Sequence, residues 1–228
     1  MQPDLSVIMP VFNEASTIEA ILNRVLAMPS LREVVVVDDG STDHTREKLD
    51  LLAGRTPIIK VVRQSRNQGK GAAIREGFKR ATGTFIVVQD ADLEYDPADI
   101  EALLEVLRAG RADVVYGSRY LTRSRAEWWH TLGNRSLTWL SNLLTARHLT
   151  DMVTCYKLIP ARIARVLPLR SDGFSFEPEV TALLARRGLR FAERPISYER
   201  RGYAEGKKIG WKDAVRAVAV MLDRAIFR

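Results

Sequence analysis

The chain is poor in cysteine, in histidine and in long hydrophobic runs. Its 228 residues include one cysteine, Cys155, and three histidines, which excludes an internal disulfide framework and argues against a zinc site built on cysteines. A single thiol suits a reducing compartment. No apolar run approaches the roughly 18 residues that cross a bilayer. The segment 1–4 carries no basic leader, so we expect neither a signal peptide nor a membrane span.

Charge, by contrast, is abundant and biased. The sequence has 35 Lys and Arg against 28 Asp and Glu, a formal net charge of +7. With 46% hydrophobic and 28% charged residues it is neither a disordered nor a fibrous chain. A basic surface favours anionic partners, namely nucleic acid, phosphorylated substrates or acidic lipid. The alternative is a basic surface that serves only solubility.

Short apolar runs rich in β-branched residues alternate with amphipathic segments. The predicted strands are 5–11, 33–38, 58–63, 84–89, 113–117, 155–159 and 190–198, and the predicted helices are 13–27, 43–53, 71–81, 97–107, 129–145, 177–187 and 209–227. Continuous apolar strands alternating with helices indicate a parallel sheet covered on both faces. No repeat or linker divides the chain, so we expect one Rossmann-like α/β domain with a mostly parallel central sheet and a C-terminal amphipathic helix.

Polar residues follow the carboxyl end of each of the first five predicted strands, where such sheets bind ligands. They belong to Pro10-Val11-Phe12-Asn13-Glu14, Asp38-Asp39-Gly40-Ser41-Thr42-Asp43, Asn67-Gln68-Gly69-Lys70-Gly71, Asp90-Ala91-Asp92 and Gly117-Ser118-Arg119. Each motif alone also fits a helix cap or a tight turn. Five of them at one predicted edge favour a binding site.

Two of these motifs carry specific chemistry. Asp90 and Asp92, one residue apart after a buried strand, can converge on Mg²⁺ or Mn²⁺, which prefer oxygen ligands. Glu94 is a candidate third ligand, or else complements the dipole of the following helix. Gly69-Lys70-Gly71 opens a predicted helix whose N-terminus favours anions. It is not a Walker A loop, because Ala72 stands where Ser or Thr is required; a plain helix start is the alternative.

Together these motifs resemble those of the family-2 glycosyltransferases, which have the glycosyltransferase-A fold. Later segments look closest to the dolichol- or polyprenyl-phosphate mannosyl- and glucosyltransferase branch. These are Gly117-Ser118-Arg119, Leu149-Thr150-Asp151-Met152 with Cys155-Tyr156-Lys157, Phe174 to Glu179, and Arg201-Gly202-Tyr203-Ala204-Glu205-Gly206-Lys207. The resemblance implies a nucleotide-sugar-binding half at 1–118, an acceptor-binding half at 119–208 and a terminal helix at 209–228.

The resemblance also implies roles for individual residues. Nucleotide-sugar binding falls to Pro10, Phe12, Glu14, Val37, Asp39, Lys70, Asp90, Ala91 and Asp92. Metal binding, with Mg²⁺ or Mn²⁺ as the cofactor, falls to Asp90, Asp92 and Glu94. Catalysis falls to Asp92, Arg119, Arg201 and Lys207, and binding of the acceptor phosphate to Arg119 and Arg201. Relatives carry a further arginine where Leu132 stands here, and we expect Arg125 or Arg135 to take its place.

The implied reaction moves a hexose, with inversion, from GDP-mannose or UDP-glucose to a polyprenyl or dolichyl phosphate. Such a phosphate is already anionic at pH 7, so no strong general base is needed. Three alternatives stay open. In the first alternative, the acceptor is a carbohydrate or small-molecule hydroxyl, with Glu177 as base. In the second, the enzyme is a nucleotidyltransferase. Or the chain is a non-enzymatic nucleic-acid-binding domain, although it shows no such motif and we expect no nucleic acid partner.

A lipid acceptor requires access to a membrane. The stretch 128–144 holds three tryptophans and five leucines beside arginines, a composition that suits an interfacial helix. The alternative is that these residues pack on the sheet. We therefore expect a cytoplasmic protein that is peripheral at the cytoplasmic face of a membrane.

Overall fold

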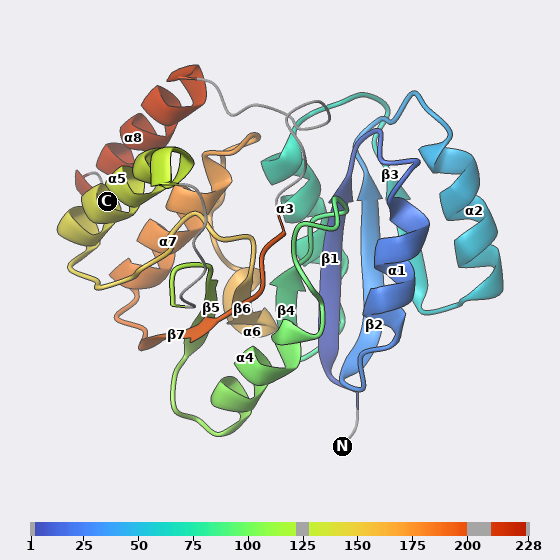
Figure 1. The fold of residues 1–228 in the computed structure, drawn as a ribbon, viewed down its shortest axis with the longest axis horizontal. Coiled ribbons are helices and arrows are strands. Elements are labelled where there is room, and N and C mark those ends of the chain that lie inside the picture. Colours follow the sequence, from blue (N-terminus) through green and yellow to red (C-terminus); the bar gives the residue numbers. More distant parts are fainter. Residues whose placement is uncertain (1–2, 122–127, 200–210, 227–228) are drawn as a thin grey trace.

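The computed structural model describes residues 3–121, 128–199 and 211–226 (Figure 1). Its strands are β1 (Leu5–Val11), β2 (Leu31–Asp38), β3 (Ile59–Arg63), β4 (Phe85–Val88), β5 (Val114–Ser118), β6 (Lys157–Pro160) and β7 (Phe191–Pro195). Its helices are α1 (Ile18–Leu26), α2 (Thr45–Arg55), α3 (Lys70–Arg80), α4 (Asp99–Arg108), α5 (Trp128–Thr145), α6 (Ala161–Ala164), α7 (Phe176–Arg186) and α8 (Trp211–Ile226).

Within the described residues, the strands form one seven-stranded sheet in the order β3-β2-β1-β4-β6-β5-β7. Every neighbouring pair is parallel except the two that involve β6, which runs antiparallel to β4 and to β5. The predicted mostly parallel sheet in a single α/β domain is therefore confirmed. Because all strands but β6 point the same way, the loops that follow them emerge at one edge.

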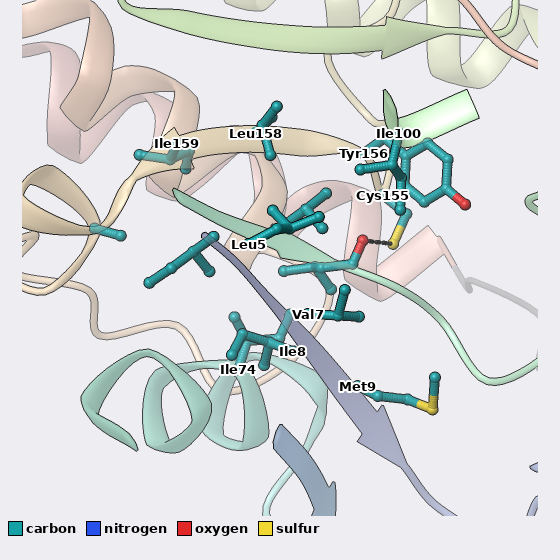
Figure 2. Packing of buried hydrophobic residues seen from close by; sticks show 14 of the residues in the cluster. Leu5, Val7, Ile8, Met9, Ile74, Ile100, Cys155, Tyr156, Leu158 and Ile159 are labelled. Atoms are coloured by element: carbon teal, nitrogen blue, oxygen red, sulfur yellow. Dashed lines mark hydrogen bonds between the residues drawn. The ribbon is translucent and has the colours of Figure 1, made fainter. Parts of the chain in front are cut away.

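The middle of the sheet is apolar on both faces. Val34, Val35, Val36 and Val37 of β2 are all fully buried. Consecutive strand residues face opposite sides, so four buried in a row require cover on both. The same alternation is visible in β1, where Ile8 lies beside Ile74 of α3 while Met9 points to the other side of the strand (Figure 2).

Most predicted boundaries lie within two residues of the observed ones, but the first helix does not. It begins at Ile18 instead of residue 13. Asn13 has a left-handed backbone, with φ 56°, which a helix cannot contain. The next residues form a turn in which the Glu14 carbonyl accepts hydrogen bonds from the amides of Thr17 and Ile18. The residues predicted as the first helical turn thus belong to the loop that follows β1 at the carboxyl edge of the sheet.

Three helices gather at the end of the sheet remote from β3, where α5, α7 and α8 pack against one another (Figure 1). The predicted C-terminal amphipathic helix is confirmed as α8, with Ala217 and Met221 buried and Val215 and Leu222 exposed. None of the helices in the described ranges is long and apolar enough to cross a bilayer.

Candidate functional site

Most of the predicted site residues that the structure describes lie along the carboxyl edge of the sheet. The loop after β2 is fastened to the loop before α3 through Asp39. The buried Asp39 carboxylate accepts hydrogen bonds from the amides of Gln68 at 2.7 Å and Gly69 at 2.8 Å. Gly69 has φ 99°, and a Cβ there would lie 2.4 Å from the Asp172 carbonyl oxygen. Asp39 therefore fixes the backbone of the turn that precedes α3, and its predicted role in binding the nucleotide sugar stays a prediction.

The loops after β1 and β2 are also joined to each other. The amide of Glu14 donates to Thr45 Oγ1 at 2.9 Å, and Glu14 Oε2 accepts from Thr17 Oγ1 at 2.7 Å. Pro10, Phe12 and Glu14 are half-buried along this edge. Val37 is fully buried in the core, so the nucleotide-binding role predicted for it applies to its backbone alone.

Three carboxylates follow β4. Asp90 Oδ2 lies 2.8 Å from Lys70 Nζ, at the first residue of α3. Asp92 accepts from the Glu94 amide at 3.2 Å, across Leu93, whose left-handed φ of 62° is unusual for a bulky residue. Burial, together with the negative charges of Asp90 and Glu94, raises the pKa of Asp92 to about 7. Glu94 Oε2 accepts a hydrogen bond from the Tyr198 hydroxyl at 2.9 Å.

These carboxylates are suited to bind a divalent cation, although they do not form a complete set of ligands for one. Across the described residues, no three His, Cys, Asp or Glu side chains are arranged to hold a metal ion by themselves. Mg²⁺ and Mn²⁺, however, commonly bind one or two carboxylates and complete their shell with substrate phosphates and water. The crowding that raises the pKa of Asp92 is what a cation relieves. Asp90 and Asp92 fit this chemistry, and a ligand role for Glu94 stays a prediction.

A row of ionised side chains extends from Lys70 into the core. Lys70 Nζ lies 3.5 Å from Glu177 Oε1, and Glu177 Oε2 is ion-paired with Lys157 of β6. Both oxygens of the candidate base Glu177 therefore face lysines. Lys157 was not predicted as a site residue. Its signal in the sequence is a charge inside the otherwise apolar run 155–159.

Arg119, directly after β5 and predicted to bind the acceptor phosphate, is held by a buried carboxylate. Its Nε and Nη2 contact Asp151 Oδ2 and Oδ1 at 2.7 and 2.8 Å, a bidentate pair. The guanidinium also lies 5.9, 5.7 and 5.1 Å from the ring centres of Tyr95, Tyr120 and Tyr198. The sequence motif contained Asp151 without a role. Tyr95 and Tyr198 come from segments that the sequence analysis did not connect with Arg119.

The other predicted acceptor cations divide into two groups. Arg135 is exposed on α5. Burial raises the pKa of Tyr120, while the positive charges of Arg119 and Arg135 oppose that rise. The part of Arg135 in binding the acceptor phosphate stays a prediction. Arg125, Arg201 and Lys207 fall outside the described residues, and their roles stay predictions.

Comparison with known proteins decides the family. The sequence profile of glycosyl transferase family 2 matches residues 6–167. The chain belongs to glycosyl transferase family 2. The match covers every strand-end motif from Pro10 to Arg119, so the family assignment rests on the same residues as the site.

Two relatives are similar over most of the chain. Dolichol-phosphate mannosyltransferase of Pyrococcus furiosus is 31% identical over 213 residues, which is 90% of this chain and 59% of that protein. Undecaprenyl-phosphate mannosyltransferase of Micrococcus luteus is 30% identical over 213 residues, which is 89% of this chain and 86% of that protein. The chain thus spans well under two thirds of the first of these family members.

A solved structure confirms the glycosyltransferase-A fold. Glucosyl-3-phosphoglycerate synthase from Mycobacterium tuberculosis, in complex with Mn²⁺, uridine diphosphate and phosphoglyceric acid, superposes with a TM-score of 0.76. The superposition covers 99% of this chain and 80% of that one at 19% sequence identity. The likeness extends from β1 to α8 and is a likeness of fold.

Proposed function

We propose that this family-2 glycosyltransferase transfers a hexose from a nucleotide sugar, GDP-mannose or UDP-glucose, to a polyprenyl or dolichyl phosphate with inversion. The observation that carries the proposal is the convergence of Asp39, Lys70, Asp90, Asp92 and Arg119 on one sheet edge. The names of the two relatives, both lipid-phosphate mannosyltransferases, support it.

The donor side of the proposal needs a divalent cation, Mg²⁺ or Mn²⁺. Asp92, with Asp90 beside it, would hold the cation, and the cation supplies Lewis-acid neutralisation of the departing diphosphate. Lys70, at the N-terminus of α3, adds a second positive charge to the same place. Asp39 contributes by fixing the turn in front of α3, so that its amides face the ligand.

The acceptor side favours a phosphate over a hydroxyl. Attack by a sugar hydroxyl requires a base with an oxygen facing the substrate proton. Glu177, the candidate for that task, has one oxygen near Lys70 and the other on Lys157. A phosphate acceptor is already anionic and needs orientation instead. Arg119, held by Asp151 in a bidentate pair, is suited to orient it, and Arg135 is the second predicted cation for that role.

Lipid access is proposed through the outer face of α5, which we place on a membrane surface. Trp139 is 67% exposed, and Leu132 and Leu143 on the same side are exposed as well. The 18 residues of α5 include Arg135 and no acidic residue, which complements anionic headgroups. A symmetric dimer formed through this same face would instead bring the positive charges of two copies together.

The inner side of α5 links this face to the site. Thr138 Oγ1 accepts a hydrogen bond from the Met152 amide at 3.1 Å, next to Asp151, the partner of Arg119. Asn142 Oδ1 accepts another from the Leu149 amide at 2.9 Å. The loop that holds Arg119 is thus packed against α5, on the side opposite to the proposed lipid surface.

The decisive experiment is an acceptor assay. The protein is incubated with Mg²⁺ or Mn²⁺ and a panel of nucleotide sugars, with and without a polyprenyl phosphate, and lipid-linked hexose and free nucleoside diphosphate are measured. We expect metal-dependent lipid-linked hexose, lost in Asp92→Asn. Donor turnover only with sugar-hydroxyl acceptors would replace the proposal with the Glu177-base alternative. Release of inorganic diphosphate would instead indicate a nucleotidyltransferase.

A further inference from the structure

Lys157 and Glu177 form a buried ion pair that the proposed reaction leaves without a task. Lys157 lies in β6 between apolar neighbours, with its side chain 2% exposed. Its ammonium group also donates to the Thr154 carbonyl oxygen and lies 5.2 Å from the centre of the Tyr116 ring. A buried ion pair adds little net stability compared with apolar residues of similar size. Its presence here is better explained by what Glu177 does with its other oxygen.

The second oxygen of Glu177 points to the site. Glu177 Oε1 lies 3.5 Å from Lys70 Nζ, and Lys70 Nζ lies 2.8 Å from Asp90 Oδ2. Along this row of contacting side chains, Lys157, Glu177, Lys70 and Asp90, positive and negative charges therefore alternate, and the net charge of the four is zero. It begins in the core, at Lys157, and ends at the partly exposed side chains of Lys70 and Asp90.

Lys70 is thus placed between two carboxylates, Asp90 from the loop after β4 and Glu177 from α7. An ammonium group carries three N–H donors on a flexible stem. Asp90 and Glu177 together fix the direction of that stem at the first residue of α3.

We propose that Glu177, itself held by Lys157, is a positioning residue that aims the Lys70 ammonium at the diphosphate of the nucleotide sugar. Asp90 accepts one N–H of Lys70 and Glu177 lies at ion-pair distance from the same nitrogen, so a remaining N–H is available to a phosphate oxygen, and the lysine loses less rotamer freedom on binding. Glu177 then acts through Lys70 and takes no proton from the acceptor. The inference rests on the nucleotide-sugar donor of the proposed function and is independent of the acceptor.

The test measures nucleoside diphosphate binding, without turnover. Isothermal titration of UDP and GDP, each with Mn²⁺, is compared among the wild type, Glu177→Gln, Lys70→Met and the variant with both changes. We expect Glu177→Gln to weaken binding about tenfold, the scale of lost supporting contacts around a bound group. Because Glu177 acts through Lys70, the double variant should bind no more weakly than Lys70→Met alone.

Glu179→Gln is the matched control. Glu179 lies in the same first turn of α7, is fully buried, and is ion-paired with Arg224 while accepting from the amides of Arg170 and Ser171. Its loss should lower the melting temperature and leave diphosphate affinity unchanged. If Glu177→Gln fails to fold because Lys157 is left unpaired, Lys157→Met combined with Glu177→Gln removes both charges. That variant is expected to show the same weakened binding.

Each outcome is informative. Unchanged diphosphate affinity in folded Glu177→Gln, an equal loss in Glu179→Gln, or additive losses with Lys70→Met would each overturn the inference. A fall in kcat of about a hundredfold or more at unchanged diphosphate affinity would make Glu177 a general base. A wild type that binds neither diphosphate would overturn the proposed function itself, and with it the inference.

Discussion

At the scale of single residues, the geometry of Arg119 depends on a fixed partner. Asp151 is fully buried, and its two oxygens hold the guanidinium in one plane against the tyrosines. The amides of Thr150 and Asp151 are in turn held by the carboxylate of Glu193 in β7. An arginine restrained in this way can present its remaining edge to an oxyanion with little loss of freedom.

Replacing Arg119 with lysine should therefore be costly in spite of the retained charge. Lysine cannot form the bidentate pair with Asp151, so the positive charge is no longer held in position. We expect the KM for polyprenyl phosphate to rise about tenfold, with nucleoside diphosphate affinity unchanged. Steady-state kinetics with varied acceptor measures this.

The control is Arg190→Lys. Arg190 makes a similar bidentate contact with Asp113, both distances being 3.1 Å, but it lies exposed before β7 at the opposite edge of the sheet. It should leave the acceptor KM as in the wild type. An unaltered acceptor KM in Arg119→Lys would remove Arg119 from the acceptor site.

At the scale of secondary structure elements, exposed apolar side chains are unevenly distributed. Among the described residues nine large apolar side chains are exposed, and five of them lie on α5 and α8, which pack against each other. These five are Leu132, Trp139, Leu143, Val215 and Leu222. Single exposed apolar residues are ordinary, whereas such a concentration marks an interaction surface.

Trp139→Glu should weaken binding to vesicles that contain anionic lipid. Burying one large apolar side chain contributes about 2 kcal/mol, so its loss should reduce partitioning at least about tenfold. Flotation with phosphatidylcholine vesicles, with and without phosphatidylglycerol, measures the effect. Leu51→Glu on α2 is the control, because Leu51 is 61% exposed but lies at the other end of the sheet (Figure 1).

Two outcomes contradict a lipid surface on α5. Equal flotation of Trp139→Glu, Leu51→Glu and the wild type would show that α5 does not contact the vesicle. A dimer that Trp139→Glu dissociates, with no vesicle binding by the wild type, would assign the face to a second copy of the chain. In either case activity on a short, water-soluble prenyl phosphate would still test the acceptor chemistry separately.

The elements themselves were largely predictable, and the exceptions have local causes. Periodicity identifies β1 and β2 because buried strands and amphipathic helices leave different patterns. The predicted start of α1 was wrong because Asn13 adopts a left-handed backbone conformation, which the apolar pattern after it does not reveal. The antiparallel direction of β6 is set by the connection from α5, which is a property of the chain path and not of the residues 155–159.

The site was predictable where its residues follow strands, and unpredictable elsewhere. Asp39, Lys70 and Asp90 each follow a strand or begin a helix, so topology alone brings them together. Lys157 and Tyr198 reach the site from segments far along the sequence, and their contacts with Glu177 and Glu94 are long-range. Only the folded chain reveals such pairings.

At the scale of the whole molecule, Glu33 joins four segments at the amino edge of the sheet. Its buried carboxylate accepts from Ser6 Oγ of β1 at 2.6 Å and from Thr82 Oγ1 at 2.9 Å, and it is ion-paired with Lys60 of β3. Burial alone would raise the pKa of Glu33, but the hydrogen bonds from Lys60, Ser6 and Thr82 outweigh it and lower the pKa from 4.5 to about 2.

This lowered pKa predicts how stability depends on pH. The native state prefers ionised Glu33, so its contribution is fully present above about pH 4.5 and is lost as the pH falls toward about 2. Glu33→Gln should be about 2 kcal/mol less stable than the wild type at pH 7. The difference should shrink between pH 4.5 and 2, as measured by urea unfolding at a series of pH values. A difference that does not vary with pH would mean that the Glu33 charge is not what stabilises this edge.

The position of β6 has a consequence for how the protein is made. β5 follows β4 along the chain, yet its two neighbours in the sheet are β6 and β7, which are both synthesised later. On a ribosome that has released residues up to about 150, β1 to β4 can already pair, while β5 has neither partner. The second half of the sheet must therefore wait for the chain to return through β6, and a translational pause before that point would leave a hydrophobic strand exposed to chaperones.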